Sequence, residues 1–169
     1  MELRKNILEM VCGQSACTSG IDRLMKADSQ RKLINLYFRH IDFCLARKVP
    51  SNDFIKANFD NKTLTSKGVY LSYTGTVENP ERTAIIGQSE MTLNFDGYSV
   101  GRVYMADNSV ATINAGGNAF VVVDCVDSSK LTVSASENAK VIVNAYSDAE
   151  VSGNTANIHR NTAKTYLLQ

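Results

Sequence analysis

The sequence predicts an α+β protein: a short N-terminal helical subdomain followed by a small β-solenoid (β-helix) with ten-residue half-coils, about 20 residues per coil. Two observations predict this fold. Residues 88–157 repeat every ten residues, seven times over, whereas residues 1–60 carry apolar side chains at helical spacing. A short fixed period is typical of stacked units that bury their apolar faces only against their neighbours. We therefore divide the chain into a helical head (1–60), a transition or capping segment (61–87), the solenoid (88–157) and a C-terminal strand or cap (158–169).

Four helices are expected in the head, over residues 3–11, 21–27, 29–48 and 52–59. The longest of them has an apolar stripe at helical spacing, and its basic residues lie largely off that stripe. The stripe consists of Leu33, Tyr37, Ile41, Cys44 and Leu45. Asp28 or Ser29 can cap the first turn of this helix, and Pro50 marks its end. Ser51 has the position of an N-cap for the last helix.

The segment 61–87 turns toward β composition. Asn79 and Pro80 mark a turn within it, because both residue types favour turn conformations. We expect this segment to cover the first coil of the solenoid.

Inside the repeat, small or apolar residues occupy every second position. A period of two places them on one side of a strand, so we expect them to face inward. Their small size indicates a narrow core, and Asn, Asp, Ser or Gly at the unit boundaries is typical of tight turns. Three consecutive units supply Ala119, Val121, Val123 and Cys125; Ser129, Leu131, Val133 and Ala135; and Ala139, Val141, Val143 and Ala145.

The outward residues favour two strands per coil over three. Pairing the units stacks Thr92, Thr112, Thr132 and Ser152 in one row, and Asn94, Asn114, Ser134 and Asn154 in the next. Stacked strands favour such ladders of like polar side chains. Grouping the units in threes places Thr92 on Val122 and loses this order. Seven half-coils then predict a body about 17 Å long at a strand spacing of about 4.8 Å.

The second outer face is apolar where the first is polar. Its candidate interface residues are Val100, Arg102, Tyr104, Phe120, Val122 and Ile142, with Lys140 beside them. Exposed β-branched and aromatic residues gathered on one face indicate a packing surface. Three occupants remain open: the protein's own helical head, a second subunit, or a foreign partner or ligand. We expect a homo-oligomer, a dimer or higher.

The two ends of a solenoid expose open strand edges that need a cover. The helical head can cap one end. Residues 158–169 are expected to supply a last strand at the other end, or to pair with a second subunit.

Tyr98, Arg102 and Tyr104 form a candidate ligand-binding set. Aromatic rings stack on nucleotide bases and the arginine fork recognises phosphate, so the set suits a small nucleotide. The alternative is that these are ordinary solvated residues of the coil.

The charge distribution argues against a partner made of duplex nucleic acid. Residues 1–67 hold twelve Lys or Arg and seven Asp or Glu, about +5, whereas residues 68–169 hold six and ten, about −4. This balance lacks the dense basic patch of a nucleic-acid binder and the strong negative field of a nucleic-acid mimic.

The chain is expected to work in the cytoplasm, with no membrane partner. The N-terminal sequence lacks an apolar stretch of signal-peptide length, and no segment approaches a membrane span of about 18 apolar residues. Four scattered cysteines, one of them at a repeat position otherwise filled by alanine, indicate reduced thiols.

One set of residues in the head has the chemistry of a metal site. Cys12, Cys17, His40 and Cys44 could supply the four ligands that zinc prefers. The spacing of the first pair, with four intervening residues, and the place of Cys44 on the apolar stripe favour core thiols and a surface histidine instead. Cys17 and His40 could also form a nucleophile and base. With no orienting acid and no oxyanion loop visible, we expect no catalytic residues, no bound metal and no cofactor.

The whole chain resembles a group of uncharacterised proteins from phages and prophages of gut bacteria, chiefly Bacteroidales. The resemblance lies in LYFRHIDFCLARKVPSNDFIKANF (36–59), which ends the helical head, and in IIGQSEMTLNFDGYSVGRVYMADNSVATI (85–113), which opens the solenoid. It implies a small protein expressed from a phage or prophage genome. It carries over no catalytic residues.

The function expected from these features is binding without catalysis. The protein would act in the host cytosol, inhibiting a host defence component or sequestering a signalling nucleotide. The alternative is a structural module of the virion or tail that assembles through its solenoid, and a weaker alternative is a metal- or thiol-dependent enzyme.

Overall fold

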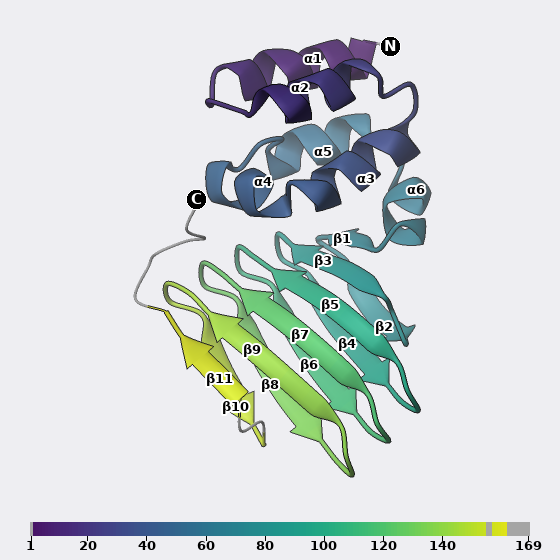
Figure 1. The fold of residues 1–169 in the computed structure, drawn as a ribbon, viewed down its shortest axis with the longest axis vertical. Helices are drawn as coiled ribbons and strands as arrows, with labels where there is room; N and C mark the ends of the chain where they lie inside the picture. The colour runs from purple at the N-terminus through teal and green to yellow at the C-terminus, as the bar shows by residue number, and fades with distance from the viewer. Residues whose placement is uncertain (1, 155–156, 162–169) are drawn as a thin grey trace. The chain divides into compact units, whose positions relative to one another are not determined.

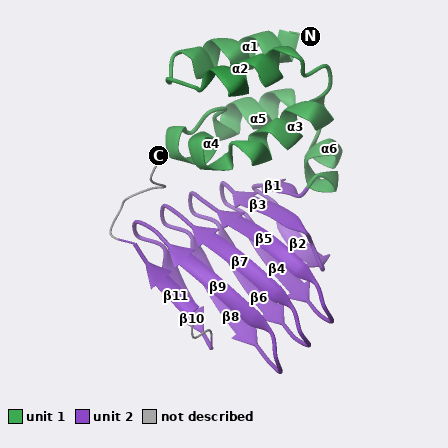
Figure 2. Ribbon diagram, in the orientation of Figure 1, with its two compact units in different colours: residues 1–67, 168–169 green, residues 68–167 purple. Residues whose placement is uncertain are grey.

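The computed structural model describes residues 2–154 and 157–161 of the chain. Within these residues, six helices are followed by eleven strands (Figure 1). The chain divides into a helical unit that ends at Lys67 and a solenoid unit that begins at Gly68 (Figure 2). This division falls inside the segment 61–87, between the limits expected for the head and the solenoid, because that segment contributes to both units.

The helical unit contains the four expected helical regions. Its helices are α1 (Glu2–Cys12), α2 (Thr18–Met25), α3 (Gln30–Arg39), α4 (Ile41–Arg47), α5 (Asn52–Asn58) and α6 (Asn61–Ser66). Their buried apolar faces form a core of Ile7, Val11, Leu24, Ala27, Leu33 and Val49. Apolar residues at helical spacing thus pack as the sequence predicts.

The helix expected over residues 29–48 is instead two helices, α3 and α4. His40 lies between them with φ −122° and ψ 36°, outside the helical region. Its N–H is shared between the carbonyls of Leu36 and Tyr37, an arrangement common at helix ends. Buried apolar residues continue from Phe38 to Ile41 across the break, so the periodicity of the sequence does not reveal it.

The predicted helix caps are confirmed. The side chain of Ser29 accepts a hydrogen bond from the backbone N–H of Lys32 at 3.4 Å. Asp28, the other candidate, instead pairs with the Nζ of Lys32 at 2.6 Å. The side chain of Ser51 accepts from the N–H of Phe54 at 3.3 Å and so caps α5.

The segment 61–87 was expected to be a β cover, but it begins with a helix. Asp60 is the N-cap of α6, and its carboxylate accepts hydrogen bonds from the N–H and the hydroxyl of Thr63, both at 2.7 Å. These bonds satisfy donors that the first turn of a helix leaves free. A local capping interaction therefore prevails here over the β composition.

The strands form a solenoid of two parallel sheets, as predicted. They are β1 (Val69–Leu71), β2 (Thr74–Glu78), β3 (Arg82–Ile86), β4 (Glu90–Phe95), β5 (Val100–Met105), β6 (Val110–Ala115), β7 (Phe120–Cys125), β8 (Lys130–Ala135), β9 (Lys140–Ala145), β10 (Glu150–Gly153) and β11 (Asn157–Arg160). One sheet has the order β1-β3-β5-β7-β9-β11 and the other has the order β10-β8-β6-β4-β2. Successive strands alternate between the sheets, so each coil contributes one strand to each (Figure 1).

The register confirms that one coil comprises two repeat units. Thr92 pairs with Thr112, which pairs with Thr132, and Thr132 pairs with Ser152. The neighbouring row of Asn94, Asn114 and Ser134 is also in register. Each partner lies two ten-residue units further along the chain, as the polar ladders predict.

Strands β1 and β2 build the first coil of the solenoid rather than cover it. Val69 pairs with Ala84, and Thr76 pairs with Thr92. The partners in both pairs lie closer together in the sequence than two repeat units, so the ten-residue period does not extend into this coil. The turn predicted at Asn79 and Pro80 lies between β2 and β3.

The core between the sheets consists of the inward residues predicted from the alternation. Val121, Val123 and Cys125 are fully buried. Gly101 also faces inward, because it pairs with Val121. A Cβ at Gly101 would overlap the ring of Phe95, so the missing side chain leaves the space that this ring fills.

The corners of the solenoid share one left-handed residue every ten positions. These residues are Gly87, Gly97, Asp107, Gly117, Asp127, Glu137 and Ser147, with φ between 56° and 69°. Where the residue is acidic, its side chain also joins adjacent coils. Asp107 accepts from the N–H of Gly87 at 2.8 Å, Asp127 from that of Asp107 at 2.9 Å, and Glu137 from that of Gly117 at 2.7 Å.

The last strands extend both sheets at the C-terminal end. Strand β10 pairs with β8, and β11 pairs with β9, with Ile158 beside Val143. The C-terminal strand expected over 158–169 is thus represented by β11. Residues 162–169 lie outside the described part of the chain.

Candidate functional site

The six candidate interface residues lie on the outward side of three adjacent strands, β5, β7 and β9. We call this surface face A; it consists of Val100, Arg102, Tyr104, Phe120, Val122 and Ile142. Val100 pairs with Phe120, and Arg102 pairs with Val122, which pairs with Ile142. The register therefore brings residues from three successive coils into one continuous surface.

Face A exposes large apolar side chains. Val100 is 64% exposed and Phe120 is 38% exposed. Val122 and Ile142 are partly buried beside them. Tyr98, in the turn before β5, is 85% exposed and extends the apolar edge of the surface. Apolar groups gathered in this way on a water-facing sheet are typical of contact surfaces.

A buried carboxylate lies at the other edge of face A. Asp124 is only 2% exposed although it is on the outward side of β7, where it pairs with Tyr104 and Asn144. Its carboxylate accepts hydrogen bonds from a guanidinium nitrogen of Arg102 and, at 2.6 Å, from the Nδ2 of Asn144. Both carboxylate oxygens are thus satisfied, which the burial of a charge requires.

The sequence pattern does not distinguish Asp124 from its neighbours. Alternation alone assigns it to an outward, solvated position, like Asn144 in the next coil. The pairing of the two repeat units does place Asp124 diagonally across from Arg102. Diagonal neighbours on adjacent strands lie within reach of long side chains, so this position could have indicated an ion pair.

The expected ligand-binding set of Tyr98, Arg102 and Tyr104 is only partly assembled. The guanidinium carbon of Arg102 lies 5.4 Å from the centroid of the Tyr104 ring, a cation–π distance. Tyr98 precedes β5 whereas Tyr104 lies near its end, and a rise of about 3.3 Å per residue separates them by more than about 13 Å. The charge of Arg102 is compensated by Asp124.

The outer side of the five-stranded sheet, which we call face B, carries the polar ladders. Asn114 donates to Asn94 at 2.9 Å, Asn94 donates to Glu78 at 2.7 Å, and Thr132 and Ser152 share a hydrogen bond of 3.2 Å. These side chains bind one another along the stack. Face B is thus mainly polar, although Val110 on β6 is 40% exposed there.

The candidate zinc ligands do not come together. Among the residues that the structure describes, no three His, Cys, Asp or Glu side chains lie close enough to hold a metal ion. Cys12 and Cys17 are exposed, whereas Cys44 is buried in the helical unit. Burial raises the pKa of the Cys44 thiol to about 12 and, in the solenoid core, that of Cys125 also to about 12.

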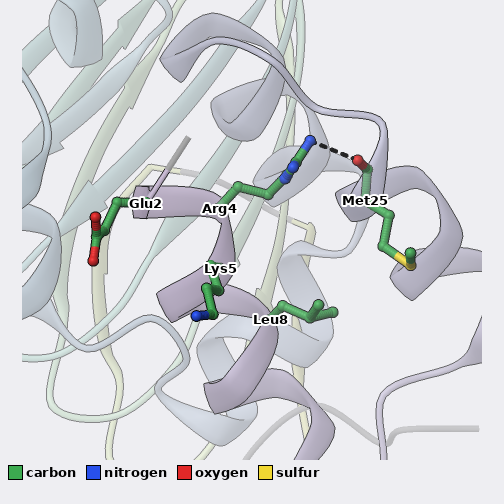
Figure 3. A pocket seen from close by; sticks show the side chains of 5 residues that line it. All are labelled: Glu2, Arg4, Lys5, Leu8 and Met25. Carbon is green, nitrogen blue, oxygen red and sulfur yellow. Dashed lines mark hydrogen bonds between the residues drawn. The ribbon is translucent and has the colours of Figure 1, made fainter.

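A groove of about 380 Å³ in the helical unit is lined by Glu2, Arg4, Lys5, Leu8 and Met25 (Figure 3). Arg4 donates from Nη1 to the backbone oxygen of Met25 at 2.8 Å. The charged ends of Glu2, Arg4 and Lys5 point in different directions. They do not converge on one point as the polar groups of a ligand site do.

No protein-family model matches the chain, and comparison with curated proteins and with solved structures gives no match. None of the described helices is long and apolar enough to cross a membrane.

Proposed function

We propose that this protein acts by binding another protein through face A, without catalysis. The observation that carries the proposal is the contrast between the two outer faces of the solenoid. Val100 and Phe120 expose apolar surface next to Tyr98 and Arg102, whereas face B exposes one large apolar side chain, Val110, beside its ladders of bonded polar groups. Aromatic residues and arginine are enriched in protein interfaces.

A second copy of the chain is the first partner we propose, which makes the protein a homo-oligomer. The paired rows of face A give a continuous surface of parallel strands, and such a surface can pack against another sheet.

A nucleotide is the less favoured ligand. Arg102 and Tyr104 could hold a phosphate and a base together, but Asp124 already compensates the guanidinium. A protein partner needs no free cation at this place.

The biological setting that we propose follows from the resemblance to phage and prophage proteins. In that setting the protein works in the cytosol of the bacterial host, where face A would bind and inhibit a defence component. The alternative, a structural role in the virion or tail, makes the opposite prediction for purified particles, in which the protein would be present in stoichiometric amounts.

A pair of substitutions tests the binding surface. Phe120→Asp with Val122→Asp places two charges on face A. Thr132→Asp with Ser134→Asp places two charges on face B and serves as the matched control. Light scattering after gel filtration measures the mass in solution, and circular dichroism checks the fold.

We expect the native chain and the face B variant to be oligomeric and the face A variant to be a folded monomer. Pull-down from infected cells with the same variants then identifies host proteins that need face A. A native chain that is monomeric and retains no host protein in a face-A-dependent way would refute the proposed function. If the face A variant unfolds and the face B variant does not, face A packs within the protein itself. That result would also refute the proposed function.

A further inference from the structure

Among the described strands of the sheet that carries face A, every exposed charged side chain is positive. Arg82 on β3 and Lys140 on β9 flank face A, because Arg82 pairs with Arg102 and Lys140 pairs with Phe120. Arg82, Arg102 and Lys140 are all exposed. The one carboxylate in the same outward rows, that of Asp124, is buried. Three cations and one carboxylate give this surface a net charge of +2.

The rest of the solenoid unit is acidic. Residues 68–169 hold six Lys or Arg and ten Asp or Glu, and all ten acids are among the described residues. Asp124 is on the outward side of the sheet that carries face A, and the other nine lie on face B or in the corners and turns between strands. A distribution that followed the composition would place more acids than cations on this side. The cations therefore mark face A as a distinct surface.

The positive charges of this surface are unfavourable for the free chain. The pairing of Arg82 with Arg102 places like charges on adjacent strands, which destabilises a sheet. Asp124 compensates Arg102, whose guanidinium it binds. Lys140 has no ion pair or side-chain hydrogen bond among the described residues. Carboxylates supplied by a partner would lower the repulsion that remains.

The cations lie around the apolar centre of face A. Lys140 is next to Phe120 on the adjacent strand, and Arg102 is next to Val122. Neighbouring strands are about 4.8 Å apart, so a partner surface that covers Phe120 and Val122 also reaches these cations. Protein interfaces combine an apolar centre with a polar rim, and the charges of the two partners are complementary. A partner with carboxylates around apolar side chains therefore fits face A.

We propose that face A binds an acidic protein surface, one that presents carboxylates around apolar side chains. This inference rests on the proposed function, in which face A binds a protein, and it adds the chemistry of the partner. A second copy that binds through face A brings the same cations, so like charges weaken the self-association. An acidic partner should therefore displace the second copy from face A.

Short synthetic peptides provide defined probes for this preference. Two peptides have leucines at the same positions and carry either glutamates or lysines around them. Their affinities for the full-length protein are measured by fluorescence anisotropy at about 0.1 M and 1 M salt, between which the Debye length falls from about 10 Å to about 3 Å. We expect the glutamate peptide to bind several-fold more tightly than the lysine peptide at the lower salt concentration, and this difference to shrink at the higher one.

Two lysines of the solenoid form a matched pair for the same test. Each is the first residue of its strand and is exposed, Lys140 beside face A and Lys130 on face B. Lys140→Glu should weaken the binding of the glutamate peptide several-fold. Lys130→Glu changes the net charge of the chain by the same amount and should leave that binding nearly unchanged. Circular dichroism checks the fold of both variants.

Equal affinities for the two peptides, no binding of either peptide, or equal effects of the two substitutions would overturn the proposal. The variant with Phe120→Asp and Val122→Asp separates this failure from failure of the proposed function. If the native chain binds both peptides equally and this variant binds neither, face A binds proteins without a preference for acids. If the variant binds the peptides as the native chain does, face A is not their site, and the proposed function fails with the acidic preference.

Discussion

Alanine in place of either of two buried serines at the same corner of the solenoid should change the stability of the protein, but in opposite directions. Ser89 and Ser109 occupy equivalent inward positions in successive coils, and they are 1% and 0% exposed. The hydroxyl of Ser109 has no hydrogen-bond partner among the described residues. At the equivalent position two coils further on the chain already has alanine, Ala149, which is also buried. The change at Ser109 is therefore one that the coil already accommodates.

The magnitudes follow from the hydrogen bonds at each site. Ser109→Ala removes an unsatisfied buried hydroxyl, a group that costs about 1–3 kcal/mol, and the small void left behind offsets part of the gain. We expect a net stabilisation of about 1 kcal/mol.

Ser89 is fully bonded. Its Oγ accepts from the N–H of Tyr73 at 3.1 Å and lies 2.8 Å from the carbonyl oxygen of Ile86 and 3.0 Å from that of Tyr70. The carbonyl of Ile86 also accepts from the N–H of Ser72, but the N–H of Tyr73 would lose its acceptor. Ser89→Ala should therefore destabilise the solenoid by about 1–3 kcal/mol.

Thermal unfolding followed by circular dichroism in the β region measures both variants. For a unit of this size, 1 kcal/mol corresponds to a shift in Tm of about 4–8 °C. Ser109→Ala should raise Tm and Ser89→Ala should lower it. A loss of stability in Ser109→Ala comparable to that in Ser89→Ala would contradict this expectation, because it would mean that the Ser109 hydroxyl is satisfied.

Four further substitutions test the core and the edge of face A by urea unfolding. Arg102→Met should destabilise the protein by about 3 kcal/mol because it leaves the buried Asp124 charge without its cation. Asp124→Asn should destabilise it less, because the Arg102 side chain that loses its partner is 46% exposed to water. Equal losses of stability in the two variants would contradict this asymmetry. Gly101→Ala should cost about 1–3 kcal/mol because the new methyl group overlaps the Phe95 ring, and an unchanged midpoint would mean that the ring moves freely. Burial raises the pKa of Cys125 to about 12 from an ordinary value of 9.0, so the unfolded thiol ionises first and stability should fall as pH rises above 9. Cys125→Ala should make this alkaline decline shallower, and an unchanged slope would argue against a buried neutral thiol.

The solenoid was predictable because two regular patterns in the sequence specify it, the alternation of apolar residues and the repeat of the units. Alternation placed Val121 and Val123 inside, and the stacking of Thr92 on Thr112 set the length of the coil. Both signals come from packing between neighbours, which a periodic sequence must repeat.

Features that occur once were not predictable in the same way. The break at His40 interrupts the backbone but not the apolar stripe. The first coil is shorter than two repeat units and so lacks the period that reveals the others. Asp60 initiates α6 through a single side-chain cap within a segment of β composition.

The candidate site was predictable only in outline. Stacking two units at a time placed Phe120 beside Val100, and the structure has the same pair. The burial of Asp124 depends on the direction in which Arg102 points, which periodicity does not encode.

The alternation of strands between two unlike sheets limits how this chain can change in length during evolution. Duplication or loss of a single ten-residue unit would shift every later strand to the opposite sheet. Residues such as Phe120 would then join the Thr/Asn ladder, and Asp127 would no longer stack on Asp107. Gain or loss of two units together keeps every strand in its own sheet. Both outer faces and the stacking of the corner residues are then preserved. Homologous chains of different lengths should therefore differ by whole coils.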